Sequence, residues 1–241
     1  MTDFAAQRRM MVDGQVRTAD VTDLRLLAAM LELPRERFFP DDKASLVYLD
    51  LDAPVSAAGQ PVRRLLKPMV LAKLIQAAAI GASDHVLDVG CASGYSTALL
   101  THLAGSVVGL EEDAALARQA ADAMSWAGKS WAGKSLAGKS LAGKSWADLS
   151  TVKIVTGPLA QGCAGEGPYD VVLLQGSAEV VPPALFDQLK NGGRLICVLG
   201  RGPQGKAMFY RRADGDISGR PVFDAAAAAL PGFAKPPEFV F

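Results

Sequence analysis

Residues that could bind a cofactor are concentrated around Asp88. The apolar residues of the sequence HVLDV predict a short buried strand that contains this acid. A loop with Gly90 and Gly94 follows the strand, and Tyr95–Leu103 then has the apolar spacing of a helix. A glycine loop between a strand and a helix brings a ligand to the backbone N–H groups at the helix N-terminus, because no Cβ holds the ligand away. The sequence therefore predicts a cofactor-binding loop.

The order of small residues in this loop distinguishes between two kinds of cofactor. A dinucleotide fingerprint needs glycine at its first, third and sixth places, which are Gly90, Ala92 and Tyr95 here. The pattern present is instead Asp-x-Gly-x-Ala-x-Gly. The next predicted strand ends in Glu111, roughly 20 residues past the loop, and a carboxylate there suits the two hydroxyls of a ribose.

This combination of loop, spacing and acid resembles the class I S-adenosylmethionine-dependent methyltransferases. The resemblance implies that the loop holds the methionine part of the donor and that the acid holds its ribose. The cofactor-binding residues that it implies are Asp88, Gly90, Cys91, Ala92, Ser93, Gly94 and Glu111. Ala92 departs from the family, which has a glycine there. The alternative is an ordinary α/β crossover that binds no ligand.

The composition limits the classes of function. A chain of 241 residues with 50% hydrophobic content fits one α/β domain with extras, or two domains at most. Basic and acidic residues number 25 each, and this balance argues against a nucleic-acid-binding protein. The three cysteines have no metal-ligand spacing, and their odd number favours a reducing compartment. With no apolar run of membrane-spanning length and no signal-type N-terminus, we expect a cytoplasmic protein that binds neither metal nor membrane.

Strands and helices alternate after residue 81, which predicts a doubly wound, seven-stranded, mostly parallel sheet, and the resemblance implies that it is of Rossmann-like methyltransferase type. The predicted strands are Val86–Val89, Ser106–Leu110, Val152–Val155, Tyr169–Leu174 and Arg194–Leu199, followed by a hairpin that turns at Asp214–Asp216. Residues 1–80 read as a helical cap and substrate-side segment, with a strong amphipathic helix over Pro68–Ile80. Residues 81–241 form the predicted cofactor-binding domain.

A five-residue repeat, SWAGK or SLAGK, fills Ser125–Ala147 and predicts an insertion into that domain. It has no core-facing stripe, because a five-residue period turns each Trp or Leu by about 140° around a helix. The stretch GKSWAGKS also matches the phosphate-loop pattern. Any repeat containing AGKS produces that match, and a helix rather than a buried strand precedes it. We therefore expect no nucleotide binding there.

Most of the chain outside the repeat resembles protein-L-isoaspartate O-methyltransferase. The resemblance rests on Leu33–Pro40 (LPRERFFP), Val86–Tyr95 (VLDVGCASGY) and Gln188–Leu195 (QLKNGGRL), and on shorter matches in the first helix and at Tyr48 and Asp50. It implies an S-adenosylmethionine-dependent enzyme that methylates the isoaspartyl carboxylate of damaged proteins or peptides, as a step in protein repair. A carboxylate is already a nucleophile at neutral pH, so no catalytic base is expected.

The sequence departs from this family where the substrate would bind. The family has Thr-Ile-Ser and one further residue before the helix proline, whereas Pro68 here follows Arg-Leu-Leu-Lys, so Leu66 replaces the hydrogen-bonding serine. The candidate substrate-binding residues are Arg64, Leu65, Leu66 and Lys67. A second departure is Gly157-Pro158-Leu159, where the family has Gly-Asp-Gly.

Three interpretations of these departures stay open. The chain methylates isoaspartyl groups through other contacts, with Arg63, Arg64 or Lys67 pairing with the carboxylate; it methylates another small acceptor; or it is a non-catalytic member that kept the fold, with or without donor binding. The basic residues are better explained as a solvated patch than as a carboxylate site, and Arg8 and Arg9 as a solvated helix face. The sequence does not indicate an oligomeric state.

Overall fold

The computed structural model describes residues 3–56, 59, 62–131 and 151–236. Its α-helices are α1 (Phe4–Met11), α2 (Leu24–Glu32), α3 (Pro68–Ala78), α4 (Tyr95–Thr101), α5 (Ala114–Trp131) and α6 (Pro183–Asp187). Its strands are β1 (Ala53–Pro54), β2 (Arg64–Leu65), β3 (His85–Val89), β4 (Ser106–Glu111), β5 (Val152–Thr156), β6 (Tyr169–Ala178), β7 (Leu189–Leu199), β8 (Lys206–Ala213) and β9 (Asp216–Asp224). No helix in these ranges is both long and apolar enough to cross a bilayer.

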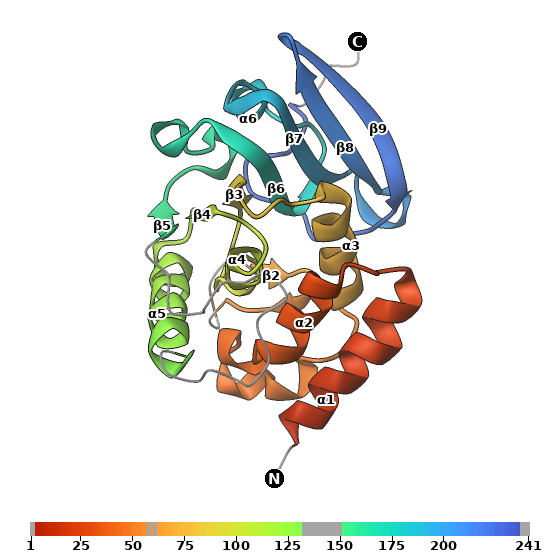
Figure 1. Cartoon of the computed structure of the whole chain (residues 1–241), viewed down its shortest axis with the longest axis vertical. Helices are drawn as coiled ribbons and strands as arrows, with labels where there is room; N and C mark the ends of the chain where they lie inside the picture. Colours follow the sequence, from red (N-terminus) through yellow and green to blue (C-terminus); the bar gives the residue numbers. More distant parts are fainter. Residues whose placement is uncertain (1–2, 57–58, 60–61, 132–150, 237–241) are drawn as a thin grey trace.

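Seven strands form one sheet in the order β5-β4-β3-β6-β7-β8-β9 (Figure 1). The first five are parallel, and β8 and β9 add an antiparallel hairpin at one end. This confirms the predicted seven-stranded, mostly parallel sheet. The strand order reverses between β3 and β6, and ligands of open α/β sheets bind beyond the carboxyl ends of the strands at such a reversal.

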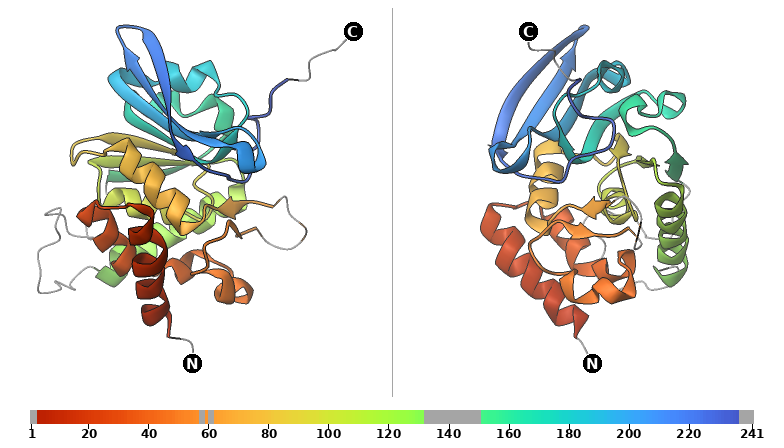
Figure 2. Two further views of the ribbon diagram at one scale, coloured as in Figure 1. Left: turned by 90° about the vertical axis from the view of Figure 1, so that its right-hand side faces the viewer. Right: turned by 180° about the vertical axis from the view of Figure 1, so that it is seen from behind.

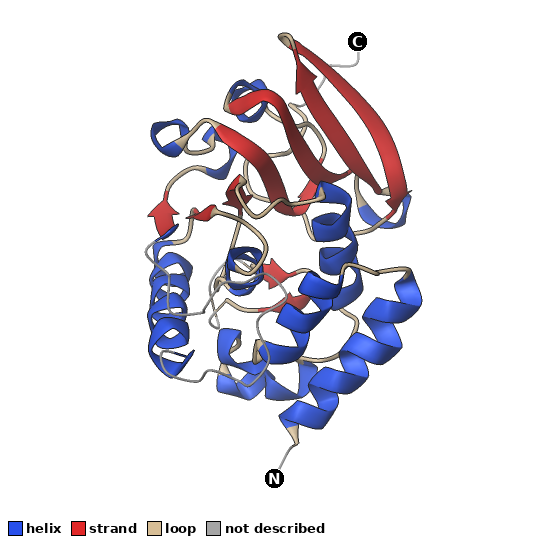
Figure 3. Ribbon diagram, viewed as in Figure 1, coloured by secondary structure: helices blue, strands red, loops and turns tan. Residues whose placement is uncertain are grey.

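Alternate residues of the central strands face two separate parts of the core. On β6, Val171 and Leu173 pack with one cluster, whereas Val172 and Leu174 pack with the other. The first cluster joins the sheet to α3, α4, α5 and the N-terminal helices, which occupy the lower half of the molecule in Figure 3. The second is covered by α6, short turns and the segment that follows β9. Burial on both faces explains why these strands read as continuous apolar runs.

The N-terminal helices reach the sheet through α3 and α4, on which α2 packs, and one of their two predicted solvent-facing arginines is half-buried. A π-helical turn over Val12–Val16 follows α1, and the N-cap of α2 is Asp23. The predicted solvated face is correct for Arg9 only. Arg8 is half-buried and donates to Tyr48 and Glu36, which ties α1 to the following loop.

Several other elements differ from the prediction in length. Helix α3 ends at Ala78, two residues before its predicted end at Ile80, and the next residue, Ala79, adopts φ +47°. Strand β6 extends to Ala178, four residues past its predicted end at residue 174. Helix α5 runs into the pentapeptide repeat as far as Trp131, and the remaining part of the repeat, with the second half of the phosphate-loop match, lies outside the described residues.

The segments before and after the sheet meet at its carboxyl end. Strands β1 and β2 form a small antiparallel pair, and Asp52 just before β1 accepts from the backbone N–H of Ala228, 176 residues later. The views in Figure 2 place the C-terminal segment beside the sheet and the N-terminus at the other end of the molecule. The C-terminal segment therefore lies near the carboxyl ends of the strands, and the N-terminus does not.

Candidate cofactor-binding site

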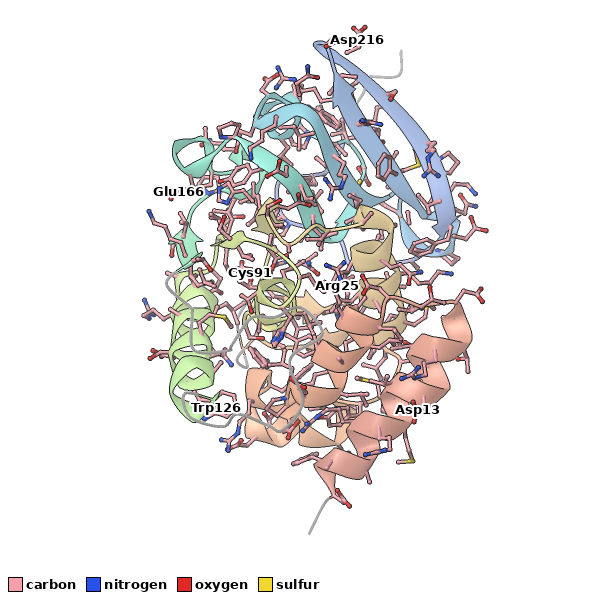
Figure 4. The ribbon with its side chains drawn as sticks, viewed as in Figure 1. Asp13, Arg25, Cys91, Trp126, Glu166 and Asp216 are labelled. Atoms are coloured by element: carbon pink, nitrogen blue, oxygen red, sulfur yellow. The ribbon has the colours of Figure 1, made fainter. Side chains whose placement is uncertain are left out.

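The loop between β3 and α4 has the backbone that its glycines predict. Gly90 and Gly94 have φ of +77° and +92°, and Ala92 has φ +50°, which is uncommon for a residue with a Cβ. A Cβ at Gly94 would lie 3.0 Å from that of Ala120, so the loop also packs closely against α5. Cys91 lies near the centre of the molecule (Figure 4), and burial raises the pKa of its thiol well above the ordinary value.

Asp88 is fully buried and connects three elements. Its Oδ2 accepts hydrogen bonds of 2.7 Å from both Ser96 and Thr97 on α4, and its Oδ1 accepts one of 2.6 Å from Gln175 on β6. Burial raises the pKa of this carboxyl to about 6, although the three donors oppose the shift. Through these hydrogen bonds Asp88 holds the loop and α4 in position. Its contact with the methyl donor stays a prediction.

Glu111 stands at the carboxyl end of β4, as predicted, and is fully buried. It accepts from the backbone N–H of Ala92 at 2.7 Å, of Glu112 at 2.9 Å and of Asp113 at 3.2 Å. Its remaining partner is the guanidinium of Arg63, whose Nη2 lies 3.0 Å from Oε2. The sequence interpretation of Arg63 as part of a solvated patch was therefore wrong, because this side chain is 6% exposed and forms a buried ion pair.

The space in front of Gly90 is filled by side chains of this chain. A Cβ at Gly90 would lie 2.8 Å from Leu230 Cδ2, 2.9 Å from Arg63 Nη2 and 3.5 Å from Leu159 Cδ1. Ser93 Oγ in the same loop is buried without a hydrogen-bond partner among the described residues, as a ligand-binding loop would have it. The loop backbone suits a nucleoside donor. No such ligand can lie against Gly90 while Arg63 and Leu230 stay in place.

The predicted substrate-side residues are largely part of the core. Leu65 and Leu66 are each 3% exposed, and the carbonyl of Leu66 accepts a 3.0 Å hydrogen bond from the buried Arg35. Arg64 and Lys67 are half-buried and contact Asp52, through the Arg64 side chain and the Lys67 backbone N–H. Leu65 and Leu66 are core residues, and the contact of all four residues with a substrate stays a prediction.

Two residues of the site carried no specific signal in the sequence. Leu230 lies in a run of alanines and prolines after the last predicted strand, where no motif marks it. Gln175 lies just past the predicted end of its strand at residue 174, yet its side chain donates to Asp88. Arg63 was named with its basic neighbours, but its partner Glu111 lies 48 residues away in the chain.

Comparisons with known proteins agree with this fold. Residues 6–227 match the model of the family described as protein-L-isoaspartate(D-aspartate) O-methyltransferase. A protein-L-isoaspartate O-methyltransferase of Koribacter versatilis is 32% identical over 212 residues, which cover 88% of this chain and 84% of the relative. One of Rhodopseudomonas palustris is 31% identical over 225 residues, covering 89% and 92%.

Two solved structures have the same fold. One protein-L-isoaspartate O-methyltransferase superposes with a TM-score of 0.76 at 22% identity, covering 93% of this chain and 66% of the other. A putative protein-L-isoaspartate O-methyltransferase from Plasmodium falciparum, in complex with S-adenosyl-L-homocysteine, has a TM-score of 0.72 at 17% identity and covers 95% and 99%. The chain belongs to the protein-L-isoaspartate O-methyltransferase family.

Proposed function

We propose that this protein is an S-adenosylmethionine-dependent methyltransferase that methylates carboxylates, with isoaspartyl groups of damaged proteins or peptides as the first substrate class to test. The observation that carries the proposal is the pairing of a positive-φ glycine loop after β3 with a buried acid at the end of β4, in a chain of this family. The structural relative from Plasmodium falciparum was solved with S-adenosyl-L-homocysteine, the demethylated donor, which makes the same ligand the natural probe here.

The residues proposed to hold the donor are those of the loop together with Glu111. When bound, the donor supplies an activated methyl group, and an ionised carboxylate acceptor needs no general base. The protein's part would therefore be to hold and orient the two molecules, which by itself lowers a barrier substantially. Arg63 and Leu230 must leave the crevice before a donor reaches Gly90.

Substrate recognition is proposed to differ from the family pattern. Leu66 cannot donate the hydrogen bond expected of a serine, and its side chain is buried. A carboxylate would thus depend on backbone groups or on the half-buried cations Arg64 and Lys67. We also interpret the pentapeptide repeat as an insertion between α5 and β5, without a part in the reaction.

A second candidate function is that of a non-catalytic family member, or of a methyltransferase with another small acceptor. The filled space in front of Gly90 favours a non-catalytic family member. The replacement of the serine by the buried Leu66 is consistent with both alternatives.

A transfer assay separates these candidates. The protein is incubated with labelled S-adenosylmethionine and either an isoaspartyl peptide or the same peptide with ordinary aspartate. We expect base-labile label in the isoaspartyl peptide alone, and its loss in Glu111→Ala. Label in small carboxylic acids but not in the peptide would indicate another acceptor. No label in any acceptor would reject the methyltransferase assignment.

A further inference from the structure

The donor crevice is closed by two segments that are far apart in the sequence. Arg63 enters from the strand pair β1–β2, and its Nη2 donates to the carbonyl of Gly90 at 3.2 Å as well as to Glu111. Leu230 enters from the segment after β9 and is 4% exposed. We call Arg63 and Leu230 the plug, because both lie where a ligand would approach the glycine backbone.

The ion pair leaves Glu111 without a free acceptor position. An ionised carboxylate offers about four lone-pair positions. Three backbone N–H groups, from Ala92, Glu112 and Asp113, use three of these positions, and Arg63 adds contacts of 3.0 Å to Oε2 and 3.4 Å to Oε1. A ribose hydroxyl can therefore bind this acid only if Arg63 leaves it.

Leu230 is held in place by backbone pairing rather than by its side chain alone. Its N–H donates to the carbonyl of Ser177 at 2.9 Å, and the N–H of Ser177 donates to Ala228 at 2.8 Å, so the segment runs beside the end of β6. Gly176 permits this approach, because a Cβ there would lie 2.7 Å from both Ala228 O and Leu230 Cγ.

Asp52 connects the two halves of the plug. One carboxylate oxygen accepts from the N–H of Ala228 at 3.1 Å, and the other accepts from the N–H of Lys67 at 2.9 Å. The segment that carries Arg63 and the segment that carries Leu230 are thus joined across the crevice. The matched part of the family model ends at residue 227, before Leu230.

We propose that the plug is a self-inhibitory device: Arg63 occupies the ribose position on Glu111, Leu230 covers Gly90, and S-adenosylmethionine binds only to the fraction of molecules in which both have moved out. This inference rests on the proposed function, since it concerns the same donor site. Apparent affinity falls by the fraction of molecules that is open, so removal of the plug should strengthen donor binding without any new contact.

The first experiment is calorimetric titration of the whole protein with S-adenosyl-L-homocysteine. We expect weak binding by the wild type and at least tenfold tighter binding by the double variant Arg63→Ala/Leu230→Ala. The control pair is Arg118→Ala and Val222→Ala, which shortens one arginine and one apolar side chain at exposed positions on α5 and β9. The controls should bind as the wild type does. Leu230→Ala alone leaves the ion pair intact and decides the matter if the Arg63 variants do not fold.

The second experiment tests the ion pair without any ligand. Removing one partner of a buried pair leaves the other charge unpaired, so Arg63→Ala and Glu111→Gln should each lower the Tm by about 10 °C. The double variant should lose clearly less than the sum of the two single losses. Additive losses would show that Arg63 and Glu111 are not coupled and would overturn the plug.

The titration outcomes separate this inference from the proposed function. Low-micromolar binding by the wild type that the double variant does not improve would overturn the plug and leave donor binding intact. A third outcome is that no variant binds S-adenosyl-L-homocysteine although the Tm values show that Arg63 and Glu111 are coupled. This result would reject the donor-binding assignment, and with it the role of the plug as a barrier to the donor. Tighter binding by the plug variants alone supports both.

Discussion

At the scale of single residues, Asp88 carries a prediction about pH. Its carboxyl has an ordinary pKa of 3.8 and a folded-state pKa of about 6, because burial disfavours the charged form. Between about pH 4 and pH 6 the folded state therefore binds more protons than the unfolded state. Raising the pH through this window lowers the free energy of unfolding, so the contribution of Asp88 is fully present below pH 4 and is lost above pH 6.

Asp88→Asn removes the titratable carboxyl and should therefore remove its contribution to the pH dependence of stability. We expect the difference in unfolding free energy, wild type minus Asp88→Asn, to fall by about 2–3 kcal/mol between pH 4 and pH 7. Urea denaturation of both proteins at unit steps of pH measures it. The difference isolates Asp88 from His102, whose pKa is lowered to about 3 by burial and whose contribution has the opposite sign. A difference that stays constant over this range contradicts the prediction.

The sequence located the residues of the loop but not their partners. Asp88 and Glu111 were found from strand ends and spacing, which are local properties of the chain. The partners of these two acids, Gln175 and Arg63, come from elements 87 and 48 residues away, so only the folded sheet brings them together. An arginine among other basic residues looks solvated in sequence, and burial beside an acid depends on tertiary contacts that no periodicity encodes.

At the scale of elements, the N-cap of α2 can be tested by substitution. Asp23 accepts from the N–H of Arg25 at 2.9 Å and of Leu26 at 3.4 Å. Asp23→Ala should cost about 1 kcal/mol of unfolding free energy, since two helix N–H groups lose their acceptor. Chemical denaturation provides the measurement.

Two matched variants give this measurement its meaning. Thr22→Ala changes an exposed neighbour and should cost less than about 0.5 kcal/mol. Asp23→Asn keeps a good capping group but loses the ion pair with Arg25, so it should stay near the wild type. A Thr22→Ala loss equal to that of Asp23→Ala would show that the cap is misassigned.

The elements themselves were predicted well, and their ends less so. The apolar runs of β3, β4 and β6 are long enough to indicate buried strands without any tertiary information. Strand β6 exceeds its prediction because Ser177 and Ala178 pair with β7 and Ser177 also pairs with the C-terminal segment, and a local pattern cannot reveal either contact. Helix α3 ends at Ala78 because the next residue, Ala79, takes a left-handed conformation. The residue type alanine does not predict that conformation.

At the scale of the whole molecule, the pentapeptide repeat should be dispensable. Removing Ser130–Lys144 deletes three units of the repeat and keeps Trp126, over whose ring Arg37 lies at 5.1 Å, and the buried Ala127. We expect a folded protein whose Tm is within a few degrees of the wild type, measured by thermal denaturation, and whose donor affinity is unchanged. An unfolded product would show that the repeat is structural.

A second deletion of equal length serves as the control. Removing Ser125–Lys139 also deletes three units, but it places Leu141 where Trp126 stood. The Arg37 contact is then lost, which should cost about 0.5–1 kcal/mol more than the first deletion. Equal stability of the two proteins would show that this contact contributes nothing.

The architecture as a whole followed from the alternation of strands and helices, because crossover rules leave few arrangements for such a chain. What did not follow was the covering of the site. The closing contacts pair residue 90 with residue 230 and residue 52 with residue 228, and contacts between such distant segments leave no trace in any window of the sequence.

The long span of the closing contacts has a consequence for how the molecule assembles and fluctuates. Contacts between segments so far apart in the chain carry the largest loop-closure entropy, and they form only after the sheet has brought their ends together. The segment of residues 225–233 touches the sheet mainly at the end of β6. Detachment of this segment would expose the buried Leu230 and Phe233 but would unpair none of the seven strands, so we expect uncovering of the ligand site to be a separate, smaller event than unfolding of the protein.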